Sequence, residues 1–326
     1  MSPPAENLPL LSVAPMMDVT DRHCRYFLRQ IAPGLQLYTE MVSAAAVLHG
    51  DRQHLLGFDP AEHPVAVQLA GNDPAALAEA SRIAAGFGYD EINLNIGCPS
   101  ARVSSGRLGA CLMAEPDLVA RCVAAMRAAV TVPVTVKTRI GIDDHDDFAF
   151  LAGFVTRVAA AGCETFIVHA RKALLQGLSP RANRSVPPLR HEVVYRLKQE
   201  FPQLRIVVNG GFDSLDGIAA ALERVDGVML GRKAADDPWF LAGVQARFHG
   251  SGSLPDRSAV VRAMHAYLGR EQARGVRPHH VTRHMLGLYR GVPGARGWRR
   301  FLAERAGGDD ATADVLLHSL AAVAAA

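Results

Sequence analysis

The stretch HPVAVQLAGNDPAALAEASRIAAGFGYDEINLNI, residues 63–96, decides the fold of this chain. It opens with the apolar run 63–70 and closes with the apolar run 91–96, and neither alternates polar with apolar residues as a half-exposed strand does. Between them, Asp73 and Pro74 are typical of a helix N-cap and first helical position. A buried strand, a helix and a second buried strand predict a parallel sheet covered by helices.

The same alternation runs from residue 10 to residue 248. Strands are expected at residues 10–16, 36–42, 63–70, 91–96, 134–138, 165–169, 205–208 and 227–230. Helices are expected at residues 21–32, 73–88, 116–130, 147–161, 192–201, 215–223 and 238–248. Eight strands favour a closed (β/α)8 TIM barrel. An open doubly wound sheet is the alternative, but Ala14-Pro15-Met16-Met17-Asp18 stands where that fold has its glycine-rich turn.

A small all-α domain is expected after the barrel. Residues 250–255 (GSGSLP) are typical of a linker, and they separate a barrel at 1–249 from a helical domain at 256–326. Its helices are expected at residues 257–274, 278–289, 297–305 and 311–325.

The positive charge of the chain belongs to that helical domain. From Ser251 onward the chain has 11 Arg, no Lys and 6 acidic residues, a net charge of +5, whereas 24 basic and 26 acidic residues precede it, a net charge of −2. The imbalance suggests a polyanion partner, although a solvated arginine-rich helix surface gives the same count.

Composition limits the class of protein. The 326 residues, 49% hydrophobic and 21% charged, suffice for a large core and a smaller second domain. No secretory signal opens the chain and no apolar run reaches the roughly 18 residues that cross a bilayer, so a cytoplasmic protein without a membrane contact is expected. Five cysteines without a CxxC pair predict free thiols, no disulfide framework and no metal site.

Two glycine-containing segments suit a phosphate group. Active sites of such barrels lie where the strands end, and Asn209-Gly210-Gly211 and Gly231-Arg232 follow strands seven and eight. Glycines let backbone N–H groups approach an anion, a following helix adds its dipole, and the arginine adds charge. Glycines that serve only tight turns are the alternative.

Lys137 ends the fifth strand and is expected to point into the barrel mouth. An ammonium there would stabilise the negative charge on the pyrimidine end of a reduced flavin. A structural ion pair with Glu40 or Glu91 is the alternative. Gln68 and His169, at other strand ends, have side chains able to hydrogen-bond the same ring or a bound base.

Cys98 lies just past the fourth strand, in the loop that follows Asn95-Ile96-Gly97. A thiol is mostly protonated near neutrality yet able to give up its proton, which suits a general acid. A lone cysteine is otherwise a small buried hydrophobe. That is the interpretation for the other four, Cys24, Cys111, Cys122 and Cys163.

Seven different short motifs follow one another along the chain in a characteristic order. They are APMMDVTD at 14–21, YTEMV at 38–42, QLAG at 68–71, NLNIGCP at 93–99, KTRIG at 137–141, HAR at 169–171 and NGG at 209–211. Together they strongly resemble the tRNA-dihydrouridine synthases over nearly the whole chain. Residues 178–184 with 187–189, and residues 284–289, resemble the A-type enzymes, which act on D-loop uridines at positions 20 and 20a.

The resemblance implies FMN as cofactor, NADPH as its reductant and tRNA as partner, with the enzyme expected to be a monomer. Hydride passes from flavin N5 to C6 of a stacked uracil, and an acid protonates C5; by motif match that acid is Cys98. The flavin contacts carried over are Pro15, Met16, Met17, Gln68, Lys137, His169, Asn209, Gly210, Gly211, Gly231 and Arg232. Asn95, Arg181 and Arg184 would face the RNA.

A uridine that enters the barrel must leave the tRNA fold, which costs a few kcal/mol and demands compensating contacts. We expect Arg296, Arg299 and Arg300 of the helical domain to supply some of them by binding phosphates. The alternatives are a flavin barrel acting on a small pyrimidine, such as a dihydroorotate dehydrogenase, and a catalytically silent RNA-binding barrel. A small substrate needs no basic tail, and Cys98, Lys137 and His169 argue against a silent barrel.

Overall fold

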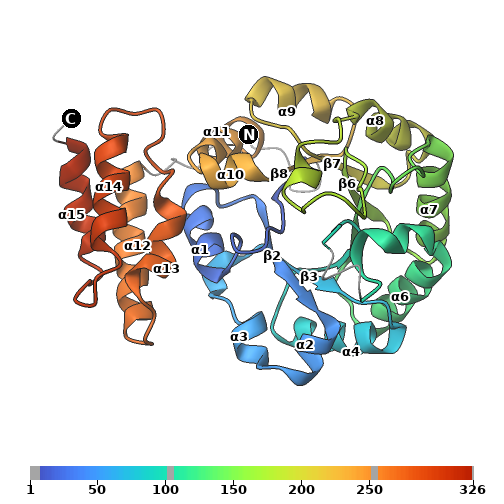
Figure 1. Cartoon of the computed structure of the whole chain (residues 1–326), viewed down its shortest axis with the longest axis horizontal. Coiled ribbons are helices and arrows are strands. Elements are labelled where there is room, and N and C mark those ends of the chain that lie inside the picture. The colour runs from blue at the N-terminus through green and yellow to red at the C-terminus, as the bar shows by residue number, and fades with distance from the viewer. Residues whose placement is uncertain (1–7, 101–105, 251–255, 325–326) are drawn as a thin grey trace. The chain divides into compact units, whose positions relative to one another are not determined.

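Eight parallel strands close into a barrel in chain order, which confirms the predicted fold class (Figure 1). The structure is a computed structural model and describes residues 8–100, 106–250 and 256–324. The strands are β1 (Leu10–Val13), β2 (Gln36–Ser43), β3 (Val65–Ala70), β4 (Glu91–Asn95), β5 (Val134–Arg139), β6 (Thr165–His169), β7 (Arg205–Asn209) and β8 (Gly227–Leu230). Closure joins β1 to β8, with Leu10 opposite Gly227. A Cβ at Gly227 would lie 2.2 Å from the Leu10 carbonyl oxygen, so only glycine fits this close approach.

Helices surround the strands as a ring, and their N-termini follow the capping signals in the sequence (Figure 1). Asp73, Asp147 and Ser214 each accept a hydrogen bond from a backbone N–H of the first turn of the helix that follows. The helices are α2 (Ala44–His49), α3 (Arg52–Leu56), α4 (Pro74–Gly86), α6 (Pro116–Ala129), α7 (Phe148–Ala160), α8 (His191–Glu200) and α9 (Leu215–Leu222). Short helices α2 and α3 were not predicted, because five or six residues are too few to show a helical period.

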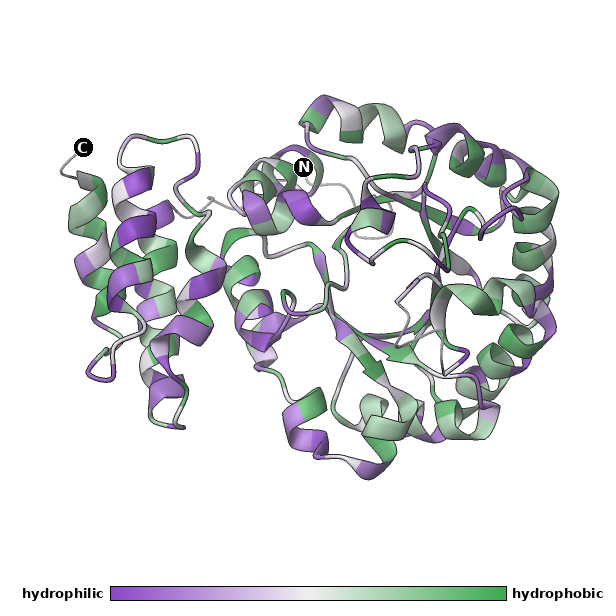
Figure 2. Cartoon of the chain, in the orientation of Figure 1, coloured by the Kyte–Doolittle hydropathy of each residue, from purple (hydrophilic) through white to green (hydrophobic). Residues whose placement is uncertain are grey.

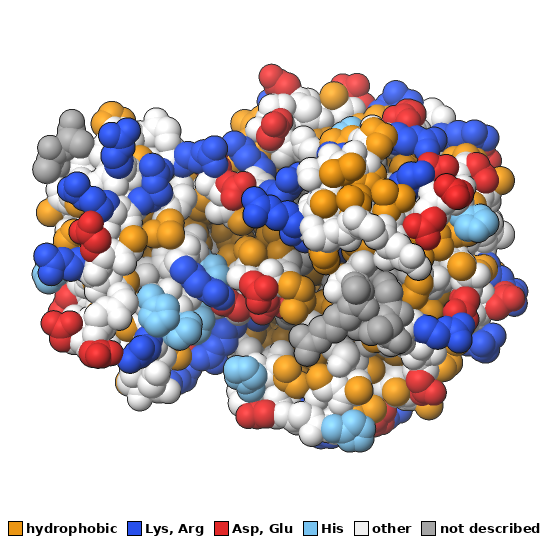
Figure 3. Space-filling view, viewed as in Figure 1, with side chains coloured by type: hydrophobic (Ala, Val, Ile, Leu, Met, Phe, Trp, Pro, Cys, Tyr) orange, Lys and Arg blue, Asp and Glu red, His pale blue; other side chains and the backbone are white. Residues whose placement is uncertain are grey.

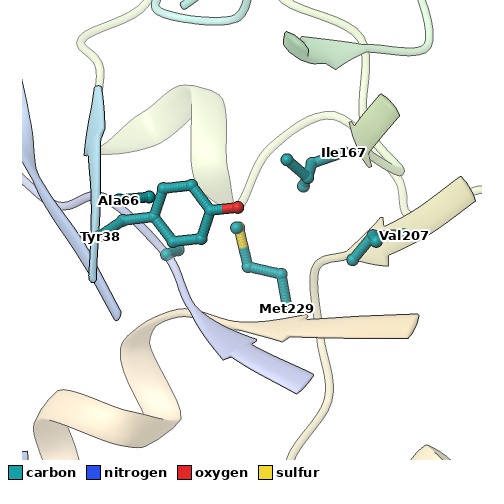
Figure 4. Packing of buried hydrophobic residues seen from close by; sticks show 6 residues of the cluster. Tyr38, Ala66, Ile167, Val207 and Met229 are labelled. Carbon is teal, nitrogen blue, oxygen red and sulfur yellow. The ribbon is translucent and has the colours of Figure 1, made fainter. Parts of the chain in front are cut away.

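A cluster of apolar side chains fills part of the barrel interior. Tyr38, Ala66, Ile167, Val207 and Met229 converge there from five different strands, and Figure 4 shows their side chains pointing toward one another. Ala14 belongs to the same cluster, and Met16 packs against it. Packed side chains thus close the barrel, so that a ligand has room only at its end.

The chain divides by its contacts into two compact units. The barrel unit contains Pro9–Met17 and Gln36–Gly231, and the helical unit contains Met1–Leu8, Asp18–Leu35 and Arg232–Ala326. The helical unit holds α1 (Arg22–Ile31), α10 (Arg232–Asp236), α11 (Phe240–Phe248), α12 (Arg257–Gln272), α13 (Pro278–Thr282), the 3-10 helix η5 (Arg283–Met285), α14 (Ala295–Arg305) and α15 (Val315–Ala324). Residues 251–255 of the predicted linker lie outside the described residues, and a separate domain at 256–326 stays a prediction.

Specific side-chain contacts join α1 to the C-terminal helices within the helical unit. The ring of Tyr26 stacks on Tyr267 of α12 with 3.9 Å between centroids, and the Tyr267 hydroxyl is 2.7 Å from Nδ1 of His23. Arg22 forms an ion pair with Glu271, whose side chain is almost fully buried. Helix α1 therefore packs with α12, although more than 200 residues separate them in sequence.

The C-terminal helices differ from the predicted ranges where side chains capture backbone groups. The predicted helix at 278–289 is the short α13 followed by η5, because the Met285 carbonyl accepts a hydrogen bond from the indole of Trp298 at 3.0 Å. Helix α15 begins at Val315 instead of residue 311, since Gln272 pairs with the Ala311 carbonyl and the Ala313 N–H. Figure 2 shows hydrophilic and hydrophobic residues mixed along these helices, and none described is long and apolar enough to cross a membrane.

Candidate active site

Polar side chains line the C-terminal end of the barrel, directly above the apolar cluster. Side chains two residues apart on a strand share a face, so Gln68 follows Ala66, His169 follows Ile167, and Asn209 follows Val207. The register of neighbouring strands brings the rest alongside. Asn95 pairs with Lys137, Arg139 with His169, and His169 with Asn209. The predicted strand-end residues of β3 to β7 therefore share one end of the barrel.

Lys137 is a half-buried lysine with no acidic partner among the described residues. Its ammonium donates to Oδ1 of Asn209 at 3.1 Å, and the Asn209 amide is held in turn by a 2.8 Å hydrogen bond to the Met229 carbonyl. Glu91 bonds Tyr38 and Thr135 instead, so the alternative of a Lys137–Glu91 ion pair is wrong. Burial, aided by the charge of Arg139, lowers the pKa of Lys137 to about 7.

A lysine without an acidic partner fits a ligand that brings negative charge, such as the pyrimidine end of a reduced flavin. The loop after β7 fits a ligand as well. Gly210 and Gly211 have φ of 119° and 79°, which other residues rarely adopt. A Cβ at Gly210 would lie 2.9 Å from the ring of His169, so the glycine keeps backbone and imidazole close together.

Cys98 is a half-buried free thiol held by its backbone. Oδ1 of Asn95 accepts hydrogen bonds from the N–H groups of Gly97 and Cys98, at 3.1 and 3.0 Å, which closes a tight turn immediately after β4. The Cys98 carbonyl accepts from the N–H of Ala110 at 2.9 Å, in the 3-10 helix η3 (Gly109–Ala114). The thiol thus has a defined position at the end of the barrel. Cys24, Cys122 and Cys163 are buried, as expected, whereas Cys111 is only half-buried.

Arg139 is a further residue of the site, and its function was not predicted from the sequence. Its buried guanidinium donates to the carbonyls of Gly97, Lys172 and Asn183 at 2.8, 3.0 and 3.1 Å, so it joins the Cys98 loop to the loop after β6. Burial lowers its pKa to about 10. Its place at the last position of β5 was the available signal, because the ends of barrel strands carry the site.

The loop after β6 presents Arg181 and Arg184 to solvent. Both side chains are exposed: Arg181 precedes the 3-10 helix η4 (Ala182–Arg184) and Arg184 ends it, while Asn183 between them is fully buried. The Asn183 amide exchanges hydrogen bonds with the backbone of Leu174, 2.8 and 2.9 Å long. The two arginines are therefore displayed on an anchored loop.

Three predicted flavin contacts follow β1. Met16 packs on the interior cluster, whereas 55% of Met17 is exposed. Pro15, which directly precedes Met16, is half-buried. Gly231 directly follows β8 in the barrel unit. Arg232 begins α10 and belongs to the helical unit.

The predicted phosphate-binding arginines lie on one helix of the helical unit. Arg296, Arg299 and Arg300 are exposed on α14, and their spacing of three and four residues places them on one face. Trp298 and Leu302 are buried on the other face. Arg299 also lines a cavity of about 400 Å³ with Ala235, Asp236, Leu286, Gly287 and Arg290. Figure 3 shows basic side chains over the C-terminal helices, all of them arginines because residues 251–326 contain no Lys.

Fold and site together define a TIM-barrel enzyme whose site lies at the C-terminal ends of the strands. The chain belongs to the dihydrouridine synthase family, because the model of that family, described as "Dihydrouridine synthase (Dus)", matches residues 12–324. The resemblance found in the sequence motifs is thus confirmed. The family is flavin-dependent.

Curated relatives match almost end to end. The chain is 54% identical over 315 residues to "tRNA-dihydrouridine(20/20a) synthase" of Escherichia coli (strain K12), covering 96% of this chain and 91% of the relative. Proteins of the same name from Xanthomonas campestris pv. campestris and Synechocystis sp. are each 56% identical, over 296 and 295 residues. These cover 91% and 90% of this chain, and 88% of each relative.

A solved structure with a similar fold is a complex of 2-naphthoyl-CoA reductase with 2-naphthoyl-CoA. It superposes with a TM-score of 0.56 at 11% identity, covering 72% of this chain. The chain spans about half the length of that reductase (49%), and at this identity the likeness shows the fold alone.

Proposed function

We propose that this chain reduces the C5=C6 bond of uridine to 5,6-dihydrouridine at positions 20 and 20a of the tRNA D-loop. The observation that carries the proposal is the membership of a dihydrouridine synthase family, with relatives of 54–56% identity named for those positions. The backbone-anchored thiol of Cys98 at the end of the barrel supports the chemistry. FMN is the proposed cofactor and NADPH its reductant.

Cys98 is the proposed catalytic acid. Reduced FMN, when bound, supplies hydride to C6 of the uracil, and the carbon that must then be protonated is C5. The Cys98 thiol carries the required proton, and the turn formed by Asn95 holds the Cys98 backbone in place. Proton transfer by a positioned side chain contributes about 10²–10⁴-fold to a rate.

The flavin is proposed to lie over the strand ends of β3 to β7. Lys137 would neutralise its electron-rich pyrimidine end. His169 and Gln68 are the proposed hydrogen-bond partners of the ring, and the Gln68 amide also bonds Asn93 and Asn95. Gly210 and Gly211 would let the backbone approach, and Asn209 orients Lys137. The other proposed contacts are Pro15, Met16, Met17, Gly231 and Arg232.

Binding of tRNA is proposed to involve two sets of arginines. Arg181 and Arg184 are exposed on the anchored loop of the barrel unit, and Asn95 lies at its strand end. The arginines on α14 supply phosphate contacts, which position an RNA without reading its sequence. A cytoplasmic location and a monomeric state stay predictions.

Incubation of the purified chain with FMN, NADPH and unmodified tRNA tests the proposal, with dihydrouridine measured by mass spectrometry and flavin by its absorbance. We expect a flavin-containing protein and dihydrouridine at positions 20 and 20a. A parallel reaction with orotate, uracil and uridine monophosphate tests the small-pyrimidine alternative. Turnover of those compounds without modification of tRNA, or a tRNA complex without any turnover, contradicts the proposal.

A further inference from the structure

A continuous chain of side-chain hydrogen bonds runs along the barrel interior from Glu91 to the turn that holds Cys98. Oε1 of Glu91 accepts the hydroxyl of Thr135 at 2.6 Å, and Oγ1 of Thr135 accepts from Nδ2 of Asn93 at 2.8 Å. Oδ1 of Asn93 accepts from Nε2 of Gln68 at 2.8 Å, and Oε1 of Gln68 accepts from Nδ2 of Asn95 at 2.7 Å. Oδ1 of Asn95 then accepts the N–H groups of Gly97 and Cys98. We refer to these five side chains, Glu91, Thr135, Asn93, Gln68 and Asn95, as the interior relay.

The interior relay has a direction, because each amide gives its NH2 group toward Glu91 and its carbonyl toward Cys98. A Thr hydroxyl has one proton, and Thr135 gives it to the carboxyl group of Glu91, so it faces Asn93 as an acceptor. That choice orients the Asn93 amide, which orients Gln68, which orients Asn95.

Both ends of the interior relay require the same direction. The backbone N–H groups of Gly97 and Cys98 are donors only, so they need the carbonyl of Asn95. At the other end, Oε1 of Glu91 accepts two hydroxyl groups, from Thr135 and from Tyr38 at 2.7 Å. With the direction reversed, the NH2 group of Asn95 would face two donors and the turn would lose its cap.

Burial makes each hydrogen bond of the interior relay costly to lose. The exposed fractions of Gln68, Asn93 and Thr135 are 1%, 0% and 2%, so no bulk water replaces a lost hydrogen bond. Burial also raises the pKa of the Glu91 carboxyl, although the hydrogen bonds from Thr135 and Tyr38 act in the opposite direction. Keeping the Glu91 carboxyl inside the barrel therefore costs free energy. The residue that bonds it is Thr135, whose hydroxyl orients the first amide of the interior relay.

We propose that Glu91 is a positioning residue, which through the interior relay fixes the Asn95 carbonyl and thereby the place of Cys98 relative to the uracil. The inference rests on the proposed function in that Cys98 is the acid. Glu91 acts at the opposite end of β4 and touches neither reactant. The requirement is for a hydrogen-bond acceptor at residue 91 and a hydroxyl at residue 135.

Two matched pairs of variants of the full, flavin-loaded chain test this requirement. Glu91→Met keeps length but removes the acceptor, whereas Glu91→Gln keeps an acceptor oxygen. Thr135→Val keeps shape but removes the hydroxyl, whereas Thr135→Ser keeps it. We expect Glu91→Met and Thr135→Val to lower kcat for tRNA roughly 10-fold to 100-fold with KM unchanged, as small misplacements of reacting groups do. Glu91→Gln and Thr135→Ser should stay near wild type.

A readout independent of turnover is the alkylation of Cys98 by iodoacetamide, followed by peptide mass spectrometry. Loss of the Asn95 cap should raise the alkylation rate of Cys98 severalfold in Glu91→Met and Thr135→Val. Cys122 is buried on α6, so its alkylation reports general loosening of the fold and should not change. Tyr38→Phe removes the other hydrogen bond to Glu91 but leaves the interior relay intact. It should change the alkylation rate of neither thiol.

Unchanged kcat and unchanged Cys98 alkylation in Glu91→Met and Thr135→Val would overturn the proposal. So would a parallel rise at Cys98 and Cys122, which indicates general destabilisation, or a Thr135→Ser variant as impaired as Thr135→Val, which indicates packing alone. If Glu91→Met does not fold, the Thr135 pair decides. Failure of the proposed function has a different signature, because a wild-type chain without activity on tRNA still shows the alkylation contrast.

Discussion

The mouth of the barrel and helix α14 of the helical unit hold their positive charges in opposite ways. At the barrel mouth, half-buried Lys137 and buried Arg139 lie among fixed hydrogen-bond partners, each with a lowered pKa. Helix α14 displays Arg296, Arg299 and Arg300 on its surface, where water and salt surround them. A buried group has no substitute partner when it is altered, whereas an exposed charge contributes little and is screened. Single substitutions at the mouth of the barrel should therefore have much larger effects than those on the surface of α14.

The largest effect is expected for Cys98→Ala. Loss of the proton donor should lower the rate of dihydrouridine formation about 10²–10⁴-fold, while flavin content stays the same. Rates are measured on unmodified tRNA with saturating NADPH. Cys111→Ala is the matched control, since Cys111 is also half-buried and free, and it should keep full activity. A Cys98→Ala enzyme with the wild-type rate disproves the proposed role.

Lys137→Met should come next, with a loss of flavin affinity of about 100-fold because the flavin loses its buried counter-charge. Without flavin the same variant should be more stable than wild type at pH 7. The folded-state pKa near 7 lies below the unfolded-state value, so the unfolded chain binds more protons between these two values. Wild-type stability should thus rise with pH above 7, by at most about 5 kcal/mol, and the variant should lack this rise.

Flavin titration and urea unfolding across pH 7 to 10 check both statements for Lys137. Lys172→Met is a suitable control, because Lys172 is paired with Asp146 at 3.1 Å and is not a strand-end residue. If Lys137→Met keeps flavin affinity, the lysine is structural.

Smaller effects are expected from joint replacement of Arg296, Arg299 and Arg300 by Gln. The affinity for tRNA should fall and its dependence on log salt should flatten by roughly 2 to 3, since each neutralised phosphate contributes about 0.7–0.9 to the slope. Filter binding between low and moderate salt measures this slope. Replacement of Arg82 and Arg157, which pair with Glu79 and Asp117 in the barrel unit, should leave it unchanged. An unaltered slope in the triple variant excludes α14 from phosphate binding.

The smallest effect is expected for Asp21→Asn in the helical unit. Burial raises the pKa of Asp21, but hydrogen bonds and charge from His284, with hydrogen bonds from Cys24 and Arg283, outweigh burial and hold this pKa well below its usual range. A depressed carboxyl pKa stabilises the fold above about pH 4 and loses that contribution as pH falls. The variant should lose about 1 kcal/mol at pH 7. Its stability should also change less than wild type upon acidification, as followed by thermal unfolding.

The barrel and the main residues of its mouth were predictable from sequence, because strand periodicity is local and strand ends meet at one edge. The register that places Lys137 beside Asn95 and His169 beside Asn209 follows from closure of eight strands. Cys98 was assignable from its place after the fourth strand together with the family motifs.

The rest depends on contacts between residues far apart in sequence. The stacking of Tyr26 on Tyr267 packs α1 against the C-terminal helices, and the pattern of residues 21–32 does not reveal which helix they contact. The interior relay is likewise hidden, since Glu91, Thr135 and Gln68 become neighbours only through side-chain hydrogen bonds across three strands. The predicted boundaries of α13 and α15 were wrong because Trp298 and Gln272 form hydrogen bonds with backbone groups there.

Single-turnover oxidation of the reduced flavin by tRNA tests the division between the two units most directly. The observed rate is measured over a range of tRNA concentrations for wild type, Cys98→Ala and the triple arginine variant. Cys98→Ala should remain slow at every concentration, whereas the arginine variant should need more tRNA but reach the wild-type rate at saturation. A Cys98→Ala enzyme that saturates at the wild-type rate, or an arginine variant that stays slow at saturation, would contradict the assignment of chemistry to the barrel and of binding to the helices.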